Sequence, residues 1–424
     1  MQIIKYPEKA TWKKLCKRPA IDMPALETSV SNILKEIKEN GDRAVKRFSS
    51  MFDKVSVDDM MVSQQEIREA ASLLSPELKG AIEQAKANIE LFHAKQLGPV
   101  EVIETVPGVR CWRKPVAIEK VGLYIPGGTA PLFSTLLMLA IPARLAGCKD
   151  IVLCSPAGKD KKIYPPILYA AQLTGVTKIY KVGGAQAIGA MAYGTETIPQ
   201  VYKIFGPGNQ YVTCAKLLIQ RDGVAIDMPA GPSEVAVYAD DTAQPAFVAA
   251  DLLSQAEHGS DSQVMLVGTS EEMIDQVLAA LDGQLADLPR KEFAEQALEN
   301  SRAVLVRNER EALDLLNEYA AEHLILSCRH AEELAEKVVN AGSVFLGHYS
   351  PESVGDYASG TNHTLPTNGA AKAYSGVSVD SFIKKITFQQ LSQEGLRNIG
   401  PAVELMAEAE GLTAHKRAVS LRLQ

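Results

Sequence analysis

Residues 116–138, VAIEKVGLYIPGGTAPLFSTLLM, contain the pattern that decides the fold. A β-rich run ends at the turn Pro126-Gly127-Gly128, and an apolar helical run follows from Leu132 to Ala146. Further units of strand, turn and helix continue to residue 232, with the strands IVLC, KIYKV, YKIF and VAID. Strands and helices that alternate at this short spacing predict a parallel sheet covered by helices.

The alternation returns after about Ala246, where the strands QVMLV, AVLV, LIL and SVFL are separated by helical segments. This predicts an α/β fold with two incomplete, doubly wound, Rossmann-like parallel sheets and small helical terminal segments. The segment from Leu26 to about Gln96 has helical periodicity, although it could supply strands that the second sheet lacks. We expect a helical arm at 1–19, a first α/β domain at 20–123 and 233–377, a second at 124–232, and a helical tail at 378–424.

Composition argues against several classes of protein. A chain of 424 residues predicts two or three domains. Its net charge of −7, without a Lys/Arg block, argues against a nucleic-acid partner. The start MQIIKYPEKATWKK lacks a signal-peptide core, and no apolar run reaches the roughly 18 residues of a membrane helix, so we expect a cytoplasmic protein without membrane contact. The six cysteines form no C-x-x-C pair, which disfavours a disulfide framework or a cysteine-built zinc site.

Two pairs of polar residues lie at the ends of predicted elements. Gln255 and His258 share one face at a helix end, where an amide oxygen and an imidazole could give half of a metal shell. A polar helix end with a capping histidine explains this pair more simply. Glu322 and His323 lie at a helix–strand junction and could form an acid–base pair. A surface glutamate beside a partly buried histidine explains them equally well.

Further candidates lie closer to the carboxyl end of the chain. Asp356 and His363 belong to a long predicted loop, 347–376, where a carboxylate could complete a metal shell or simply form a turn. Glu410 and His415 lie on either side of a helix break, and an ordinary charged helix surface is the simpler explanation for them. The clustering of His with Gln, Glu and Asp nevertheless favours one shared, metal-assisted site.

The glycine turns at 183–186 and 206–209 differ from the Rossmann fingerprint G-x-G-x-x-G. As motifs they are weak indicators of a dinucleotide. The context of strand, glycine and helix still fits a phosphate or nucleotide bound at helix N-termini.

A series of motifs in chain order resembles histidinol dehydrogenase: VGLYIPGGTAPLFSTLLM, KVGGAQAI, KIFGPGNQYV, IDMPAGPSE, DLLSQAEHG, EHLI, GDYASGTNHTLPT and LTAHKRAV. The resemblance is highly specific and runs from about Cys111 to the end of the chain. The helical N-terminal quarter resembles the family in kind but carries fewer diagnostic residues. No position that the family uses departs from its pattern.

The resemblance implies an enzyme that oxidises L-histidinol to L-histidine with NAD through a bound histidinaldehyde, the last step of histidine biosynthesis. It implies one Zn²⁺ per subunit, with ligands at Gln255, His258, Asp356 and His415. The implied base pair is Glu322 and His323, and the implied NAD contacts are Tyr124, Gln186 and Asn209. Implied substrate contacts are Ser233, Gln255, His258, His323, Asp356, Glu410 and His415, with His363 nearby. It also implies a homodimer in which the tail supplies Glu410 and His415 to the partner's site.

Two other functions remain open on the residues alone. A zinc hydrolase using Glu322 would explain the polar cluster but leave the glycine turns without a role. A non-catalytic nucleotide-binding regulator would explain the turns but not the cluster. In an oxidoreductase, His323 can take the hydroxyl proton while hydride leaves to NAD, and Glu322 can deprotonate the water that attacks the aldehyde. The imidazole and amine of histidinol are also good nitrogen ligands for zinc, which makes the metal chiefly a template.

Overall fold

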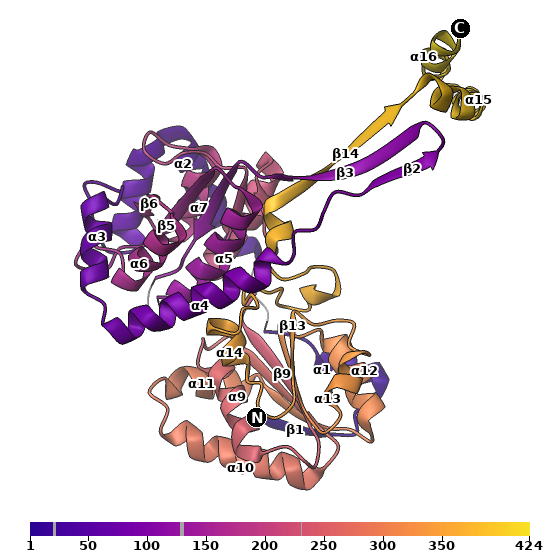
Figure 1. The fold of residues 1–424 in the computed structure, drawn as a ribbon. Coiled ribbons are helices and arrows are strands. Elements are labelled where there is room, and N and C mark those ends of the chain that lie inside the picture. The colour runs from indigo at the N-terminus through magenta and orange to yellow at the C-terminus, as the bar shows by residue number, and fades with distance from the viewer. Residues whose placement is uncertain (20–22, 128–130, 230) are drawn as a thin grey trace.

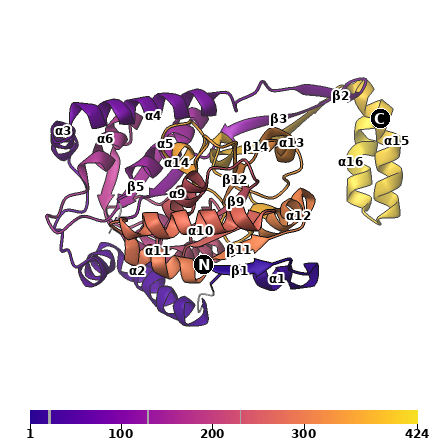
Figure 2. The same cartoon turned by 90° about the horizontal axis from the view of Figure 1, so that it is seen from below.

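The computed structural model describes residues 1–19, 23–127, 131–229 and 231–424. Two α/β units lie against one another, and an arm of strands and two helices projects from one of them (Figure 1). A second view shows the arm standing away from the body in the same way (Figure 2). Each unit contains a parallel sheet, so the predicted α/β fold with two doubly wound sheets is confirmed.

The smaller parallel sheet contains the strands predicted between residues 116 and 232. Its strands, in spatial order, are β6 (Lys178–Lys181), β5 (Asp150–Ser155), β4 (Lys120–Tyr124), β7 (Lys203–Phe205) and β8 (Ala225–Ile226). The chain moves outward from β4 to β5 and β6, then crosses to β7 and β8 on the other side. This reversal creates a topological switch point beside β4, where parallel sheets of this type bind ligands.

Helices cover both faces of this sheet. They are α2 (Met23–Phe52), α3 (Gln64–Ser72), α4 (Pro76–Ala94), α5 (Phe133–Ala146), α6 (Pro165–Thr174), α7 (Gly184–Tyr193) and α8 (Gln210–Ile219). One face carries α2, α7 and α8, and the other carries α3, α4, α5 and α6. Gly147 and Gly175 end α5 and α6 in the left-handed conformation, which glycine adopts without strain.

The packing of α2–α4 differs from the expected domain division, which grouped residues 20–123 with 233–377. Ile37 of α2 packs against α7, and Ile89 of α4 belongs to the core that α5 shares; both are fully buried. A Cβ on Gly189 of α7 would lie 2.9 Å from Ile37 Cδ1, so the glycine allows the close approach of α2. Periodicity shows which face of a helix is apolar, but it does not show which sheet that face covers.

The second sheet is parallel and has six strands. In spatial order these are β1 (Gln2–Lys5), β11 (Arg302–Leu305), β10 (Gln263–Gly268), β9 (Glu234–Ala239), β12 (His323–Ser327) and β13 (Ser343–Leu346). The expected helical arm at 1–19 is therefore wrong in its first residues, because β1 pairs with β11 along the edge of the sheet. A four-residue edge strand has too little local pattern to be recognised without its distant partner.

Helices also cover both faces of the second sheet. They are α1 (Trp12–Leu15), α9 (Pro245–Ala256), α10 (Glu271–Ala286), α11 (Lys291–Glu299), α12 (Glu309–Tyr319) and α13 (Ala331–Ala335). One core lies under α9, α10 and α11, and a second lies under α1, α12 and α13. A further short helix, α14 (Glu352–Tyr357), lies inside the predicted loop at 347–376. Short 3-10 turns lie at Lys9–Thr11, Gln220–Asp222, Ala370–Lys372 and Val379–Phe382.

The arm is built from an antiparallel sheet and a helical hairpin. Its elements are β2 (Val102–Val106), β3 (Val109–Ala117), β14 (Ile383–Leu391), α15 (Gln393–Ala409) and α16 (Thr413–Leu423). The expected helical tail at 378–424 is therefore wrong where β14 pairs with β3, with Trp112 stacked on Phe388 at 5.5 Å. Strand β14 forms because β3, which lies more than 260 positions earlier, offers its edge.

Strand ends of the two parallel sheets face the same cleft. The turns after β4 and β7 bring Pro126 and Asn209 to it, so the smaller sheet contributes the carboxyl ends of its strands. Ser233 and His323 come from the amino ends of β9 and β12 in the larger sheet. In the sequence, residues 227–233 connect β8 to β9; Ala230 in this linker and Gly128 in the turn after β4 lie outside the described residues.

Candidate active site

A cavity of about 340 Å³ lies between the two sheets. Its lining contains most of the polar candidates that the sequence suggested for the metal and the substrate. They are Ser233, Gln255, His258, Glu322, His323, Asp356 and His363. Side chains separated by up to 130 positions therefore share one cleft, although each was ambiguous when considered by itself.

A larger cavity of about 990 Å³ adjoins the first. It is lined by Tyr124 and Gln186, and Pro126 and Asn209 line both cavities. The larger cavity lies at the switch point of the five-stranded sheet, between the turns that follow β4, β5 and β6. An elongated ligand at this switch point would extend one end into the smaller cavity past Asn209.

His323 is the first residue of β12 and Glu322 directly precedes it, so neither lies at the end of a helix. Helix α12 ends at Tyr319, and Ala320 with φ 54° turns the chain toward the strand. Both side chains are buried, at 6% and 3% exposure. His323 Nδ1 lies 3.7 Å from Glu322 Oε2, and His323 Nε2 lies 3.3 Å from Asp356 Oδ1. The imidazole is therefore placed between two carboxylates inside the cleft.

The close approach of these side chains and their burial shift the pKa values of Glu322 and His323. Burial raises the pKa of Glu322 to about 8, even though the backbone N–H of Glu234 donates to it at 3.0 Å. Burial by itself would lower the pKa of His323, but the carboxylates of Glu322, Asp356 and Glu352 outweigh it and raise that pKa. Perturbed, mutually facing titratable groups in a cleft are typical of acid–base catalysis.

Two oxygen atoms in the cleft fit a metal ion. Gln255 lies in the last turn of α9 and Asp356 in α14. Among the described residues Gln255 Oε1 has no hydrogen-bond partner, and Asp356 Oδ1 faces the imidazole of His323 at 3.3 Å. Buried oxygens without partners are costly unless a ligand satisfies them. His258 follows α9 directly and lines the same cavity. Within the described parts of the chain, no three His, Cys, Asp or Glu side chains group closely enough to hold a metal.

His363 joins the two α/β units at the cleft. Its Nδ1 donates to the carbonyl of Asp356 at 2.7 Å, because a carbonyl can only accept. Its Nε2 lies 2.8 Å from Thr135 Oγ1 of α5 and, when the ring is neutral, accepts a hydrogen bond from that hydroxyl. Burial lowers the pKa of His363 and favours that neutral form. Both ring nitrogens are thus used, which suits a residue that holds α14 in place.

The three predicted cofactor contacts lie around the larger cavity. The Tyr124 hydroxyl accepts from Gly184 N at 3.0 Å, and Gln186 Nε2 donates to Asp53 Oδ2 at 3.1 Å. Asn209 caps α8, since its Oδ1 accepts from the N–H groups of the first turn at 3.1 and 3.2 Å. Asn209 lines both cavities and so lies where they meet.

Glu410 and His415 do not reach this cleft in their own chain. They lie at the junction of α15 and α16, at the end of the arm, and both are exposed. Neither lines either cavity. The arm carries them away from the body (Figure 1).

Glu352, which no sequence motif singled out, lies near the imidazole of His323. Glu352 is 1% exposed, accepts from Ser254 Oγ at 2.7 Å, and places Oε2 3.9 Å from His323 Nδ1. Burial raises its pKa to about 7. Its spacing of four residues from Asp356 puts both on one face of α14, a signal that becomes visible only once the loop is known to contain a helix.

Known proteins match the chain along its whole length. The family model for histidinol dehydrogenase matches residues 16–423. Histidinol dehydrogenase of Bacteroides thetaiotaomicron is 60% identical over 423 residues, covering 100% of this chain and 99% of that protein. The chloroplastic enzyme of Oryza sativa subsp. japonica is 53% identical over 410 residues, covering 96% and 86%. The crystal structure of histidinol dehydrogenase from Elizabethkingia anophelis superposes with a TM-score of 0.98 at 56% identity, covering 100% and 98%.

Together with the two sheets and the polar cleft between them, these matches define an α/β oxidoreductase. The chain belongs to the histidinol dehydrogenase family, so the predicted resemblance is confirmed. This membership favours neither the zinc hydrolase nor the non-catalytic regulator.

All six cysteines are free thiols. Among the described residues, no helix combines the length and the apolar character needed to cross a bilayer.

Proposed function

We propose that this protein oxidises L-histidinol to L-histidine with NAD, passing through a bound histidinaldehyde, as the last step of histidine biosynthesis. Family membership supports the substrate and the pathway. The observation that carries the proposal is the pair of adjoining cavities. One is lined by acid–base groups and possible metal ligands, the other lies at a Rossmann-like switch point, and Asn209 lines both.

The dinucleotide is proposed to occupy the larger cavity, with Tyr124, Gln186 and Asn209 as its contacts. When bound, NAD accepts a hydride in each of the two oxidations. Tyr124 and Gln186 are buried and fixed by hydrogen bonds to Gly184 and Asp53, so they offer rigid walls. Rigid walls hold a ligand's reactive end in place at small entropic cost.

His323 is proposed to remove the hydroxyl proton in the first oxidation. Its ring lies at the floor of the smaller cavity, between Glu322 and Asp356, and these carboxylates stabilise the imidazolium that forms. Glu322 is proposed to deprotonate the water that attacks the aldehyde. Its raised pKa makes the carboxylate a stronger base than an exposed glutamate.

We propose that Zn²⁺ is held by Gln255, His258 and Asp356 of one chain and by His415 of the other chain of the dimer. The unpartnered amide oxygen of Gln255 and the cleft-lining carboxylate of Asp356 fit this role, and the ligand set is oxygen-rich enough to admit other divalent metals. When bound, zinc serves chiefly as a template that orients the imidazole and amine of the substrate. Ser233 and His258, which line the same cavity, are proposed to contact the substrate.

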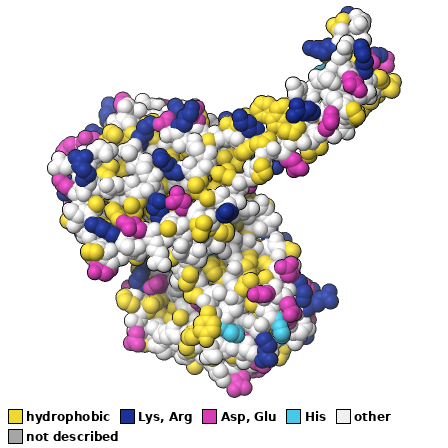
Figure 3. Space-filling view, viewed as in Figure 1, with side chains coloured by type: hydrophobic (Ala, Val, Ile, Leu, Met, Phe, Trp, Pro, Cys, Tyr) yellow, Lys and Arg dark blue, Asp and Glu magenta, His cyan; other side chains and the backbone are white. Residues whose placement is uncertain are grey.

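We propose that the protein is a homodimer in which Glu410 and His415 enter the partner's cleft. The arm exposes large apolar side chains, including Val102, Ile103, Ile386, Leu405 and Met406. Hydrophobic side chains gather over its strands in the space-filling view (Figure 3). A projecting arm with an apolar surface is typical of an element that packs on a second copy.

A cytoplasmic location remains a prediction from the sequence.

The direct test is an assay with purified protein, L-histidinol, NAD and Zn²⁺, in which NADH absorbance and histidine are both measured. The proposal predicts two NADH per histidine formed. One NADH per histidinol, with free aldehyde released, would contradict the four-electron reaction. An absence of NADH would contradict the proposed substrate. The His323→Asn variant serves as the control for background reduction of NAD.

A further inference from the structure

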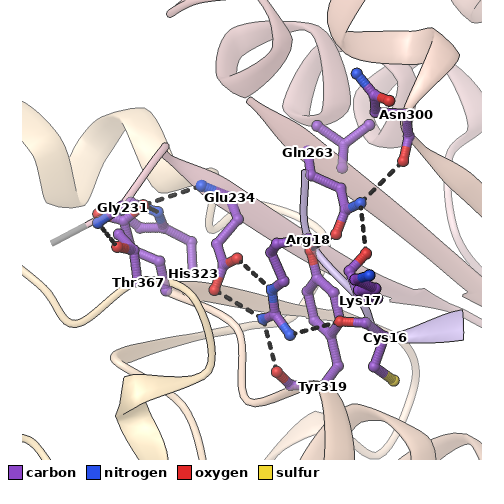
Figure 4. A network of polar contacts seen from close by, with 12 residues as sticks. Cys16, Lys17, Arg18, Gly231, Glu234, Gln263, Asn300, Tyr319, His323 and Thr367 are labelled. Atoms are coloured by element: carbon purple, nitrogen blue, oxygen red, sulfur yellow. Dashed lines mark hydrogen bonds and ion pairs between the residues drawn. The ribbon is translucent and has the colours of Figure 1, made fainter. Parts of the chain in front are cut away.

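Arg18, whose side chain is 10% exposed, lies at the centre of a network of polar contacts (Figure 4). Its guanidinium donates twice to Glu234, from Nε at 2.7 Å and from Nη2 at 2.9 Å. Nη2 also donates to the carbonyl of Tyr319 at 2.7 Å, and Nη1 to the carbonyl of Cys16 at 3.0 Å. A planar guanidinium held at both ends in this way fixes the orientation of the carboxylate that it binds.

The network is stiffened by Tyr319, which is fully buried at the end of α12. The guanidinium of Arg18 stacks over its ring at 3.7 Å from the centroid. The Tyr319 hydroxyl donates to Gln263 Oε1 at 3.0 Å, and Gln263 Nε2 donates to the carbonyl of Asn300 at 2.9 Å. The Arg18 side chain therefore links the N-terminal segment, the end of α12 and strand β10.

Glu234 connects this network to the cleft. It is the first residue of β9, follows the cavity-lining Ser233, and is 1% exposed. Its side chain points to Arg18, whereas its backbone N–H donates to Glu322 Oε2 at 3.0 Å. Among the described residues no second hydrogen-bond donor reaches the Glu322 carboxylate. The start of β9 thus sets the direction of that carboxylate.

We propose that Arg18 and Glu234 are positioning residues, whose ion pair fixes the start of β9 so that its amide holds Glu322 toward the cleft. Arg18 also balances the charge of Glu234, which otherwise would repel the carboxylate of Glu322, since both glutamates are buried. This inference rests on the proposed function, in which Glu322 is the base of the second oxidation. It assigns the N-terminal segment a part in aldehyde oxidation.

The test compares Arg18→Met with Leu281→Ala in the full-length protein. Leu281 is a buried residue of α10 outside both cavities, so its truncation lowers stability without touching the network. Single-turnover NADH formation separates the two oxidations, and thermal unfolding reports stability. We expect Arg18→Met to slow aldehyde oxidation on the order of 10- to 100-fold and alcohol oxidation much less. Leu281→Ala should leave the ratio of the two rates at the wild-type value.

Two further variants separate positioning from simple destabilisation. Arg18→Lys keeps the charge but not the paired hydrogen bonds, so it should restore the aldehyde step in part. The double variant Arg18→Met with Glu234→Met removes the buried ion pair, and it should stay slow in aldehyde oxidation even where its unfolding temperature recovers. Equal slowing of both steps in Arg18→Met, or recovery of the aldehyde step together with stability in the double variant, would overturn the inference. If wild-type protein forms no NADH from histidinol, the proposed function itself fails, and the inference fails with it.

Discussion

Replacing Glu322 by Gln should separate the two oxidations. The amide oxygen of Gln can still accept from Glu234 N–H at 3.0 Å, so the fold and the cleft should be retained. The substitution removes the carboxylate that deprotonates water, and loss of a general base costs about 10²- to 10⁴-fold in rate, or roughly 3–5 kcal/mol of transition-state stabilisation. His323 keeps Asp356 at 3.3 Å as a carboxylate neighbour, so we expect the alcohol step to slow by less than about ten-fold.

The assay is single-turnover formation of NADH with enzyme in excess over L-histidinol. Wild type should give two NADH per substrate, whereas Glu322→Gln should give one quickly and the second slowly. Because burial raises the pKa of Glu322 to about 8, the wild-type aldehyde rate should increase with pH up to about that value, and the variant should lose this dependence. Glu318→Gln, on the partly exposed surface of α12, is the matched control. Equal slowing of both phases by Glu322→Gln would refute the separate roles.

Other predictions concern the first oxidation, the metal and the stability of the fold. His323→Asn should bind zinc but slow alcohol oxidation by about 10²- to 10⁴-fold, and near-normal turnover would contradict its role. Zinc added to chelator-treated protein should raise the unfolding temperature, and Gln255→Ala should weaken that rise, because zinc binds only the folded site. Burial raises the pKa of Asp251 to about 7, so its contribution to stability is present below its unfolded pKa and is lost as pH rises through 7. Asp251→Asn should therefore be more stable than wild type at about pH 8, on the order of 1 kcal/mol, and unfolding temperatures that differ equally at about pH 5 would contradict this.

The alternation of strand, turn and helix could be predicted because its signals are local. The run that ends at Pro126 and the helix from Leu132 each carry a pattern visible within about 15 residues. Helix α5 begins at Phe133 and ends at Ala146, one residue away from the predicted start. Glycines mark the turns because the backbone there needs left-handed conformations, as at Gly184 with φ 62°.

Elements that depend on distant partners could not be predicted in the same way. Strand β1 exists because β11 offers an edge about 300 positions later, and β14 exists because β3 does so in the arm. The assignment of α2–α4 to the five-stranded sheet depends on the surfaces that these helices cover. Long-range contacts of this kind leave little trace in the periodicity of either partner.

The residues of the candidate site were ambiguous locally and became specific through the family resemblance. Gln255 and His258 could be a helix end, and Glu322 with His323 could be a surface pair, until the fold brought them to one cavity. Arg18 and Glu352 gave no signal, because a lone charged residue in sequence does not reveal that it will be buried against another. Local periodicity gave no sign that α16 stays away from the cleft of its own chain, whereas the family resemblance implied that the tail serves the partner's site.

Complementation between two variants that form little histidine tests most directly whether two chains share one site. The activity followed is histidine formation, which Glu322→Gln and His415→Asn should each suppress at every site of their own homodimers. In a mixed dimer with exchanged arms, one of the two sites combines an intact Glu322 with an intact His415 from the partner chain. Random mixing in equal amounts makes about half of the dimers mixed, so activity should recover to about a quarter of the wild-type value. No recovery over a range of mixing ratios, with mixed dimers shown to form, would contradict a site shared between two chains.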